Sequence, residues 1–192
     1  MAEMDPTLAT LAEHNGIPPL WPRDPGFPTM VRLILEQQVS LASADAAFQK
    51  LERVIGSVEP EAFVGLNDVE LRVIGFSRQK TGYVRGVATG LLDGSIDLNA
   101  VASLDDSAAM GRLLEIRGIG PWTAACYLLF AHRRPDIWPP GDRALQVSMG
   151  RVFDLPEVPD VKDSNARATA WRPLRSIAAR MLWYEYLGAP GE

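Results

Sequence analysis

The chain has 192 residues, of which 47% are hydrophobic and 22% are charged, and its net charge is −5. This length and composition fit one globular domain, or two lobes that share a core, and exclude a disordered chain. A single cysteine, Cys126, excludes an internal disulfide and a Cys-rich zinc or iron–sulfur site, and the presence of only two histidines argues against a His-based metal site.

Apolar residues at helical spacing predict a series of helices along the chain. The first predicted helix covers residues 27–40 (FPTMVRLILEQQVS), and the second covers 42–56 and ends at Gly56. A third begins at Asn67, where Glu70 follows three residues later in a capping-box pattern. A fourth covers residues 77–94. No run alternates with the period of a strand, so the predicted fold class is all-α.

The segment LEIRGIGPWTAACYLLF, residues 114–130, contains the signals of a helix, a tight turn and a second helix. The helix before it begins near Ser103, with Asp106 three residues on as a capping partner. Gly118 suits a helix end that needs a positive φ, Gly120 permits close backbone approach, and Pro121 suits the first position of the next helix. The predicted structure is a helix, a short hairpin and a helix.

The N-terminus of the second helix would present free N–H groups and a positive dipole end at residues 120–123. With glycines in front of it, a phosphate could reach these groups, and such a contact positions DNA without reading its sequence. The alternative from spacing alone is an ordinary tight corner between two helices.

A second motif, WPPGDRAL at residues 138–145, places Asp142 on a Pro-Pro-Gly turn, where it can cap a helix that begins at Arg143. Residues 155–166 are rich in proline and aspartate and predict a surface loop that leads into a helix. The last predicted helix covers 171–187. Pro-rich breaks near 18–28 and 135–141 suggest one domain, 1–192, with a lobe A of residues 1–28 and 139–192 and a lobe B of residues 29–138.

The negative net charge argues mildly against a nucleic-acid partner, but the basic residues are unevenly distributed. Residues 112–151 contain six arginines against three acids, and residues 167–180, which include Arg175, contain four arginines and no acid. Arginine suits phosphate because its planar fork binds bidentately. A solvated surface is the alternative explanation of these charges.

No apolar run approaches the roughly 20 residues that a membrane-spanning helix needs. The first ten residues, MAEMDPTLAT, lack the basic and apolar regions of a signal peptide. We therefore expect a soluble cytoplasmic protein with no membrane partner.

The hairpin GIGPWTA followed by WPPGDRAL resembles the helix-hairpin-helix DNA glycosylase superfamily. The stretches LILEQQVSLASA, LRVIGFSRQKTGYV and WRPLRSIAARMLWYEYLG resemble its DNA-3-methyladenine glycosylase II (alkylbase) branch, in the compact form without an N-terminal β-rich domain. The resemblance implies a two-lobed helical fold with a DNA-binding cleft between the lobes. It also implies an enzyme of base excision repair that flips an alkylated base and hydrolyses its N-glycosidic bond.

The resemblance assigns roles to individual residues. Asp142 is the catalytic carboxylate: it would stabilise positive charge on the deoxyribose and is also placed to activate the attacking water. Trp122 and Trp183 would stack on the flipped base in its pocket, since an indole face attracts a base made cationic by alkylation. Another pocket aromatic of the branch falls at Cys126 here. Tyr127, beside it, is included in the predicted pocket although its position on the helix differs.

The resemblance also identifies the residues that contact DNA. Gln38, with Gln37 beside it, lies where the family places the side chain that fills the gap left by the flipped base. Solvent-exposed glutamines are the alternative. The predicted DNA-binding residues are Gln37, Gln38, Gly118, Gly120, Thr123 and Arg175.

Bifunctional relatives place a lysine two residues after the second hairpin glycine, where it forms a Schiff base with the sugar. Trp122 occupies that position here, which predicts a monofunctional glycosylase without a lyase step. The lack of a cysteine cluster excludes the iron–sulfur endonuclease III-like branch. No cofactor is implied, although the backbone carbonyls of Leu114, Ile116 and Ile119 could bind a monovalent cation, as in the family.

The expected partner is double-stranded DNA that contains damaged bases, bound by a monomer associated with the nucleoid. Two other classes of function stay open at this point: a non-catalytic helix-hairpin-helix DNA-binding module, and a helical protein-interaction domain, which the negative charge favours. Among substrates, 3-methyladenine, 7-methylguanine, ethenoadenine and hypoxanthine are all compatible with the sequence.

Overall fold

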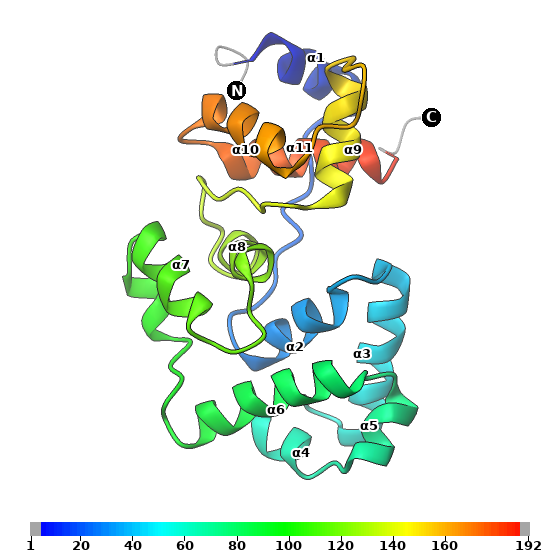
Figure 1. The fold of residues 1–192 in the computed structure, drawn as a ribbon, viewed down its shortest axis with the longest axis vertical. Helices are drawn as coiled ribbons and strands as arrows, with labels where there is room; N and C mark the ends of the chain where they lie inside the picture. The colour runs from blue at the N-terminus through cyan, green and yellow to red at the C-terminus, as the bar shows by residue number, and fades with distance from the viewer. Residues whose placement is uncertain (1–4, 189–192) are drawn as a thin grey trace. The chain divides into compact units, whose positions relative to one another are not determined.

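The computed structural model describes residues 5–188, and these residues form helices and connecting turns without a β-strand, which confirms the all-α prediction. They divide into two compact units (Figure 1). One unit runs from Arg23 to Tyr127, and the other contains the described chain up to Pro22 and again from Leu128. The lobe boundaries predicted from the sequence, after residues 28 and 138, lie further along the chain.

The unit from Arg23 to Tyr127 is built around helix α2. Its apolar residues are buried on almost every side because α3 and α6 pack against it, and α4 in turn packs on α6 (Figure 1). Phe63 of α4 contacts the rings of Phe27 and Phe76 edge-on, with centroids 6.0 and 5.4 Å apart. The helices of this unit are α2 (Phe27–Glu36), α3 (Leu41–Ile55), α4 (Pro60–Val64), α5 (Asp68–Ile74), α6 (Arg78–Leu92), η1 (Ala100–Ser103), α7 (Asp106–Leu114) and most of α8 (Pro121–Phe130).

The other unit packs the helices of both chain ends around the last one. Helices α1 and α9 both pack against α11. Trp171 is fully buried: its indole N–H donates to Asp5 Oδ2 at 2.7 Å, and its ring stacks on Phe153. The helices here are α1 (Pro6–Asn15), α9 (Arg143–Val152), α10 (Val161–Ala168), η2 (Thr169–Trp171) and α11 (Arg175–Tyr186).

Several predicted helix ends are confirmed by their caps. Asn67 and Glu70 form the predicted capping box of α5, and α3 ends before Gly56, which has φ +73°. The predicted cap of α7 is wrong. Asp105, not Ser103, caps it by accepting from Ala108 N, because the Ser103 hydroxyl donates within η1 to Ala100 O.

Two predicted helices are shorter than the sequence pattern suggested. Helix α2 ends at Glu36 rather than at residue 40, because Gln37 is extended and Gln38 has φ +58°. Helix α11 begins at Arg175 rather than at Trp171, because Pro173 forces the preceding Arg172 into an extended conformation. Within residues 5–188, no helix combines the length and the apolar character needed to cross a membrane.

Candidate functional site

The predicted helix–hairpin–helix is present in the unit that runs to Tyr127. Helix α7 ends at Leu114, and Gly118 in the turn has φ +91°. The N–H of Ile119 donates to Ile116 O, and α8 begins at Pro121, as predicted. The first turn of a helix has N–H groups without partners inside that helix, and the helix dipole makes this end of α8 favourable for a negative charge.

Glycine suits the two positions in the hairpin, 118 and 120, for different physical reasons. A Cβ on Gly118 would lie 2.2 Å from Cγ of Tyr83, a residue of α6, so the Tyr83 ring fills the space that a side chain would need. A Cβ on Gly120 would meet no heavy atom within 4 Å. Gly118 is therefore required for packing and for its positive φ, whereas only Gly120 leaves the backbone open to a ligand.

Gln37 connects the end of α2 to the hairpin. Its Nε2 donates to Gly118 O at 3.0 Å and to Thr123 Oγ1 at 2.9 Å. Thr123 is 2% exposed. These two side chains were predicted to bind DNA, but they bind each other inside the protein. They are therefore not among the proposed DNA contacts.

Gln38 differs from its neighbour because it is exposed and sits in the left-handed region, with φ +58°. That region is uncommon for residues other than glycine and occurs often at functional sites. Val39 and Leu41 after it are 47% and 57% exposed. The turn thus presents Gln38 at the surface beside two apolar side chains.

Asp142 occupies the start of α9, after a turn in which Gly141 has φ +73°. Its Oδ1 accepts a hydrogen bond from Leu145 N at 2.9 Å, which confirms the predicted cap, and a second from Trp183 Nε1 at 3.2 Å. The carboxylate is half-buried. Two donors on one oxygen fix the orientation of the carboxylate.

Trp183 therefore has a contact that sequence reasoning missed. Its ring is 9% exposed and stacks on Phe130, with centroids 5.3 Å apart and planes 22° from parallel. One face of the indole is covered by Phe130, and its N–H points at Asp142. Trp122, the other predicted pocket tryptophan, is half-buried in the first turn of α8 and belongs to the other unit.

Two predicted site residues have structural roles instead. Tyr127 is fully buried, and its hydroxyl accepts from Gly26 N at 2.9 Å, so its ring has no face to offer a base. Arg175 donates from Nε to Asp136 Oδ1 at 2.7 Å and from a terminal nitrogen to Asp136 O at 2.6 Å. Neither residue is part of the proposed site.

The pairing with Arg175 also affects the protonation state of Asp136. Partial burial acts to raise the pKa of Asp136, but hydrogen bonds and charge from Arg175, together with the charge of Arg172, outweigh it and lower that pKa. The carboxylate is therefore stabilised in its charged form, which fixes the guanidinium of Arg175 against the protein.

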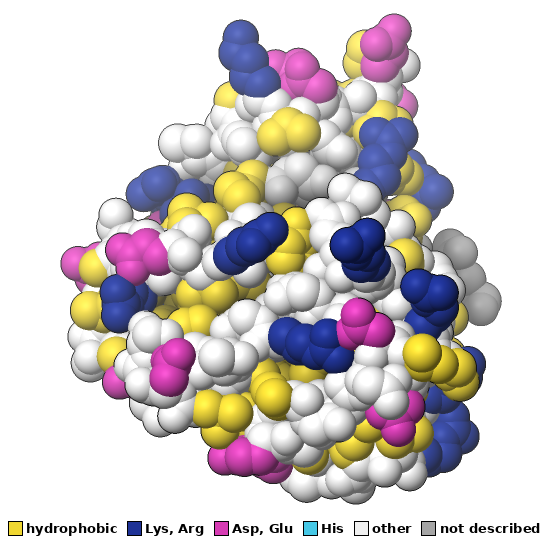
Figure 2. All heavy atoms as spheres, turned by 60° about the horizontal axis from the view of Figure 1, so that its bottom comes forward, with side chains coloured by type: hydrophobic (Ala, Val, Ile, Leu, Met, Phe, Trp, Pro, Cys, Tyr) yellow, Lys and Arg dark blue, Asp and Glu magenta, His cyan; other side chains and the backbone are white. Residues whose placement is uncertain are grey.

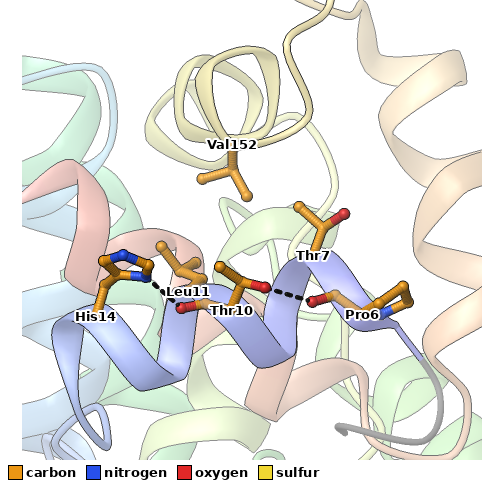
Figure 3. A pocket seen from close by; sticks show the side chains of 6 residues that line it. All are labelled: Pro6, Thr7, Thr10, Leu11, His14 and Val152. Atoms are coloured by element: carbon orange, nitrogen blue, oxygen red, sulfur yellow. Dashed lines mark hydrogen bonds between the residues drawn. The ribbon is translucent and has the colours of Figure 1, made fainter.

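One hollow on the surface lies apart from these residues. It has a volume of about 400 Å³ and lies between α1 and Val152 of α9 (Figure 3). Two of its polar side chains bond to the backbone of α1 itself: Thr10 Oγ1 donates to Pro6 O, and the His14 ring lies 2.9 Å from Thr10 O. None of the predicted site residues lines it, so it is not the candidate active site.

No group of three or more His, Cys, Asp or Glu residues within 5–188 could hold a metal ion. The predicted cation site uses backbone carbonyls, of which Ile116 O accepts from Ile119 N. A carbonyl oxygen has a second lone pair, so this geometry is compatible with a monovalent ion, and the site stays a prediction.

The fold and these motifs define a helix-hairpin-helix protein. Residues 31–173 match the family described as HhH-GPD superfamily base excision DNA repair protein, and the chain belongs to that superfamily. YfjP of Bacillus subtilis is 29% identical over 183 residues, which cover 91% of this chain and 63% of YfjP. The chain thus spans less than two thirds of that relative's length.

Two solved structures have the same fold. DNA-3-methyladenine glycosidase from Bacillus halodurans is 28% identical with a TM-score of 0.78, over 96% of this chain and 86% of that one. The 3-methyladenine DNA glycosylase Mag1 of Schizosaccharomyces pombe, solved in complex with abasic DNA, is 22% identical. Its TM-score is 0.85, over 96% of this chain and 93% of that one.

The difference between the hairpin glycines gives a prediction about stability. Gly118→Ala should lower the free energy of unfolding by about 2–4 kcal/mol, because it adds left-handed strain and a clash with Tyr83. Gly120→Ala should change it by less than about 0.5 kcal/mol, because its Cβ meets nothing. Urea unfolding of both variants measures this. Equal losses would show that Tyr83 does not occupy the space beneath Gly118.

Proposed function

We propose that this chain is a monofunctional DNA glycosylase that flips alkylated bases out of duplex DNA and hydrolyses their N-glycosidic bond. The observation that carries the proposal is the arrangement at Asp142. Its carboxylate stands at the start of α9 with one oxygen fixed by Leu145 N and Trp183 Nε1. Asp142 is also the residue to which the family resemblance assigns the catalytic role.

The proposed chemistry needs a negative charge of fixed orientation. Cleavage of the glycosidic bond develops positive charge on the deoxyribose, and a preorganised carboxylate stabilises that charge in the transition state. The turn at Gly141 and the indole of Trp183 keep the Asp142 carboxylate from reorienting as the charge develops. An Asp142-bound water is the proposed nucleophile, because it would enter beside the same charge.

The proposed contacts with DNA come mainly from the protein backbone at the N-terminus of α8 and from one inserted side chain. On the face drawn in Figure 2, lysine and arginine side chains are separated by acidic, hydrophobic and uncharged ones, and they form no continuous basic surface. The N-terminus of α8 after Gly120 supplies the proposed phosphate contact. Gln38 is the proposed gap-filling side chain, supported by its exposure and its left-handed backbone.

Trp122 is the proposed stacking partner of the flipped base. It is half-buried and stands where a bifunctional enzyme would carry its lysine, so we propose that no Schiff base forms. Trp183 enters the proposal differently from the sequence prediction. Because Phe130 covers one face of its ring, its main proposed contribution is the hydrogen bond to Asp142.

The named relatives support the substrate class. The Bacillus halodurans structure is titled a DNA-3-methyladenine glycosidase, and 28% identity over almost the whole chain favours an alkylated base here. Action on damaged double-stranded DNA, as a monomer in the cytoplasm with the nucleoid, is part of the same proposal. A non-catalytic DNA-binding module is the outcome that the following test would reveal.

Asp142→Asn separates chemistry from folding. The amide oxygen can accept both hydrogen bonds that Oδ1 accepts, so stability should fall by no more than about 1 kcal/mol, and DNA binding should persist. Single-turnover excision should fall roughly 100-fold or more, because preorganised charge is worth about 3–4 kcal/mol in a transition state. Wild-type excision by the variant would reduce Asp142 to a helix cap.

Gln38→Ala should slow excision from stable base pairs more than from mismatches or single strands. The gap-filling side chain offsets an unstacking cost of a few kcal/mol, and that cost is smallest where the base is already unpaired. The matched control is Gln49→Ala on α3, where the amide binds Asp45 on an exposed surface. Equal losses on all substrates would argue against a gap-filling role.

Gly120→Ala should weaken binding to DNA of every sequence by a similar factor, because the added Cβ stands between a phosphate and the backbone. Binding of the wild type should also weaken as salt rises, since phosphate contacts release counterions. Fluorescence anisotropy with several unrelated duplexes over a salt series measures both. A loss confined to one sequence would contradict a backbone contact.

A further inference from the structure

Lys80 contacts the backbone of the turn that contains Gln38. It stands in the first turn of α6, and its Nζ donates to Leu35 O at 2.7 Å and to Gln37 O at 2.8 Å. Helix α2 ends at Glu36, so its last carbonyls have no partners within the helix. A cation at a helix C-terminus is also favourable to the helix dipole. Lys80 thus caps α2 from a different helix.

Burial distinguishes Lys80 from a surface lysine. The chain contains three lysines, of which Lys50 and Lys162 are exposed and Lys80 is half-buried. Partial loss of hydration lowers the pKa of Lys80. Two short hydrogen bonds from one ammonium group to two carbonyls, with a residue between them, fix the path of the backbone up to Gln38.

The same turn is fixed on its other sides. The side chain of Gln37 is bound to the hairpin through Gly118 O and Thr123 Oγ1. The carboxylate of Glu36 accepts two hydrogen bonds from Arg23, at 2.7 and 3.1 Å. These contacts hold Glu36 and Gln37 in place, and Gln38, which follows them, has a left-handed backbone conformation.

We propose that Lys80 is a positioning residue for Gln38: it fixes the carbonyls of the α2 terminus so that the Gln38 side chain is held out for insertion into duplex DNA. This inference rests on the proposed glycosylase function. Tyr83, three residues further along α6, lies beneath Gly118 of the hairpin. One helix thus supports both elements that are proposed to contact DNA.

A double-mutant cycle tests this role. Lys80→Met keeps the aliphatic stem and removes the donors, and Lys50→Met on α3 is its matched control. Single-turnover excision by Lys80→Met should fall roughly tenfold from a stable pair and much less from a mismatch. In a Gln38→Ala background, Lys80→Met should cause little further loss, because the residue that it positions is already gone.

A structural role alone would give a different result. The proposal would be overturned if Lys80→Met slowed excision from stable pairs and from mismatches by the same factor. It would also be overturned if the loss in the double variant equalled the product of the losses in the two single variants. Should Lys80→Met fold poorly, Lys80→Gln retains a neutral donor for one carbonyl and should show the same substrate pattern with a smaller loss. The control Lys50→Met should excise both substrates at the wild-type rate.

Amide hydrogen exchange of the free protein tests Lys80 without any excision assay. Lys80→Met should accelerate exchange in a peptide that covers residues 36–41, with no change in peptides from α9 and α11. If the wild type excised no base from any lesion duplex, the proposed function would fail, and this measurement would still decide the role of Lys80. Unchanged exchange in residues 36–41 would overturn the inference.

Discussion

The double hydrogen bond to one oxygen of Asp142 is the interaction on which the proposed chemistry depends. A carboxylate on a surface turn samples several rotamers, and each reorientation would cost part of the electrostatic stabilisation that it offers a developing cation. Here Leu145 N and Trp183 Nε1 select one orientation. The oxygen that caps α9 thus belongs to the same carboxylate that is proposed to act in catalysis.

The packing behind Asp142 explains why this orientation persists. Helix α11 packs on α9, and it brings Trp183 to the start of α9 although 41 residues separate Trp183 from Asp142. The stack on Phe130 at 5.3 Å fixes the plane of the indole and therefore the direction of its N–H. Without the ring of Phe130, the hydrogen bond from Trp183 to Asp142 would lose this support.

In the other unit, rigidity serves the proposed contact with DNA. A turn that fills the gap in a duplex must resist being pushed aside, and loops rarely do so without partners. The turn at Gln38 has partners on three sides: Lys80 from α6, the hairpin through Gln37, and Arg23 through Glu36. The exposed side chain of Gln38 thus follows a turn that is held by partly buried hydrogen bonds.

The sequence predicts much of this arrangement and misses a definable part. Periodicity and capping predict the helices, the hairpin turn and Asp142 as a cap, because those signals are local and lie within a few residues of each other. The end of α2 and the start of α11 are not predicted, because Gln38 is not a glycine and the helical apolar pattern continues on both sides of Pro173.

Three further features that the sequence does not predict are contacts between distant segments. They are the contact of Tyr83 with the space at Gly118, the bond from Lys80 to Gln37 and the bond from Trp183 to Asp142. The two residues of each pair are 35, 43 and 41 positions apart in the sequence, respectively. Tyr83 resembles any apolar residue on the face of a helix, and Lys80 resembles any surface lysine. Nothing in the local pattern distinguishes them, so only the folded chain assigns their roles.

The most direct test of the account is a wild-type assay on duplexes that each carry one alkylated base. Base release, strand breaks and borohydride-trapped adducts would be scored separately in the same reaction. The account predicts abasic sites in at least one duplex, with intact strands and no trapped adduct, because Asp142 assists hydrolysis and no lysine stands at residue 122. Tight binding to every duplex without the release of any base would contradict it.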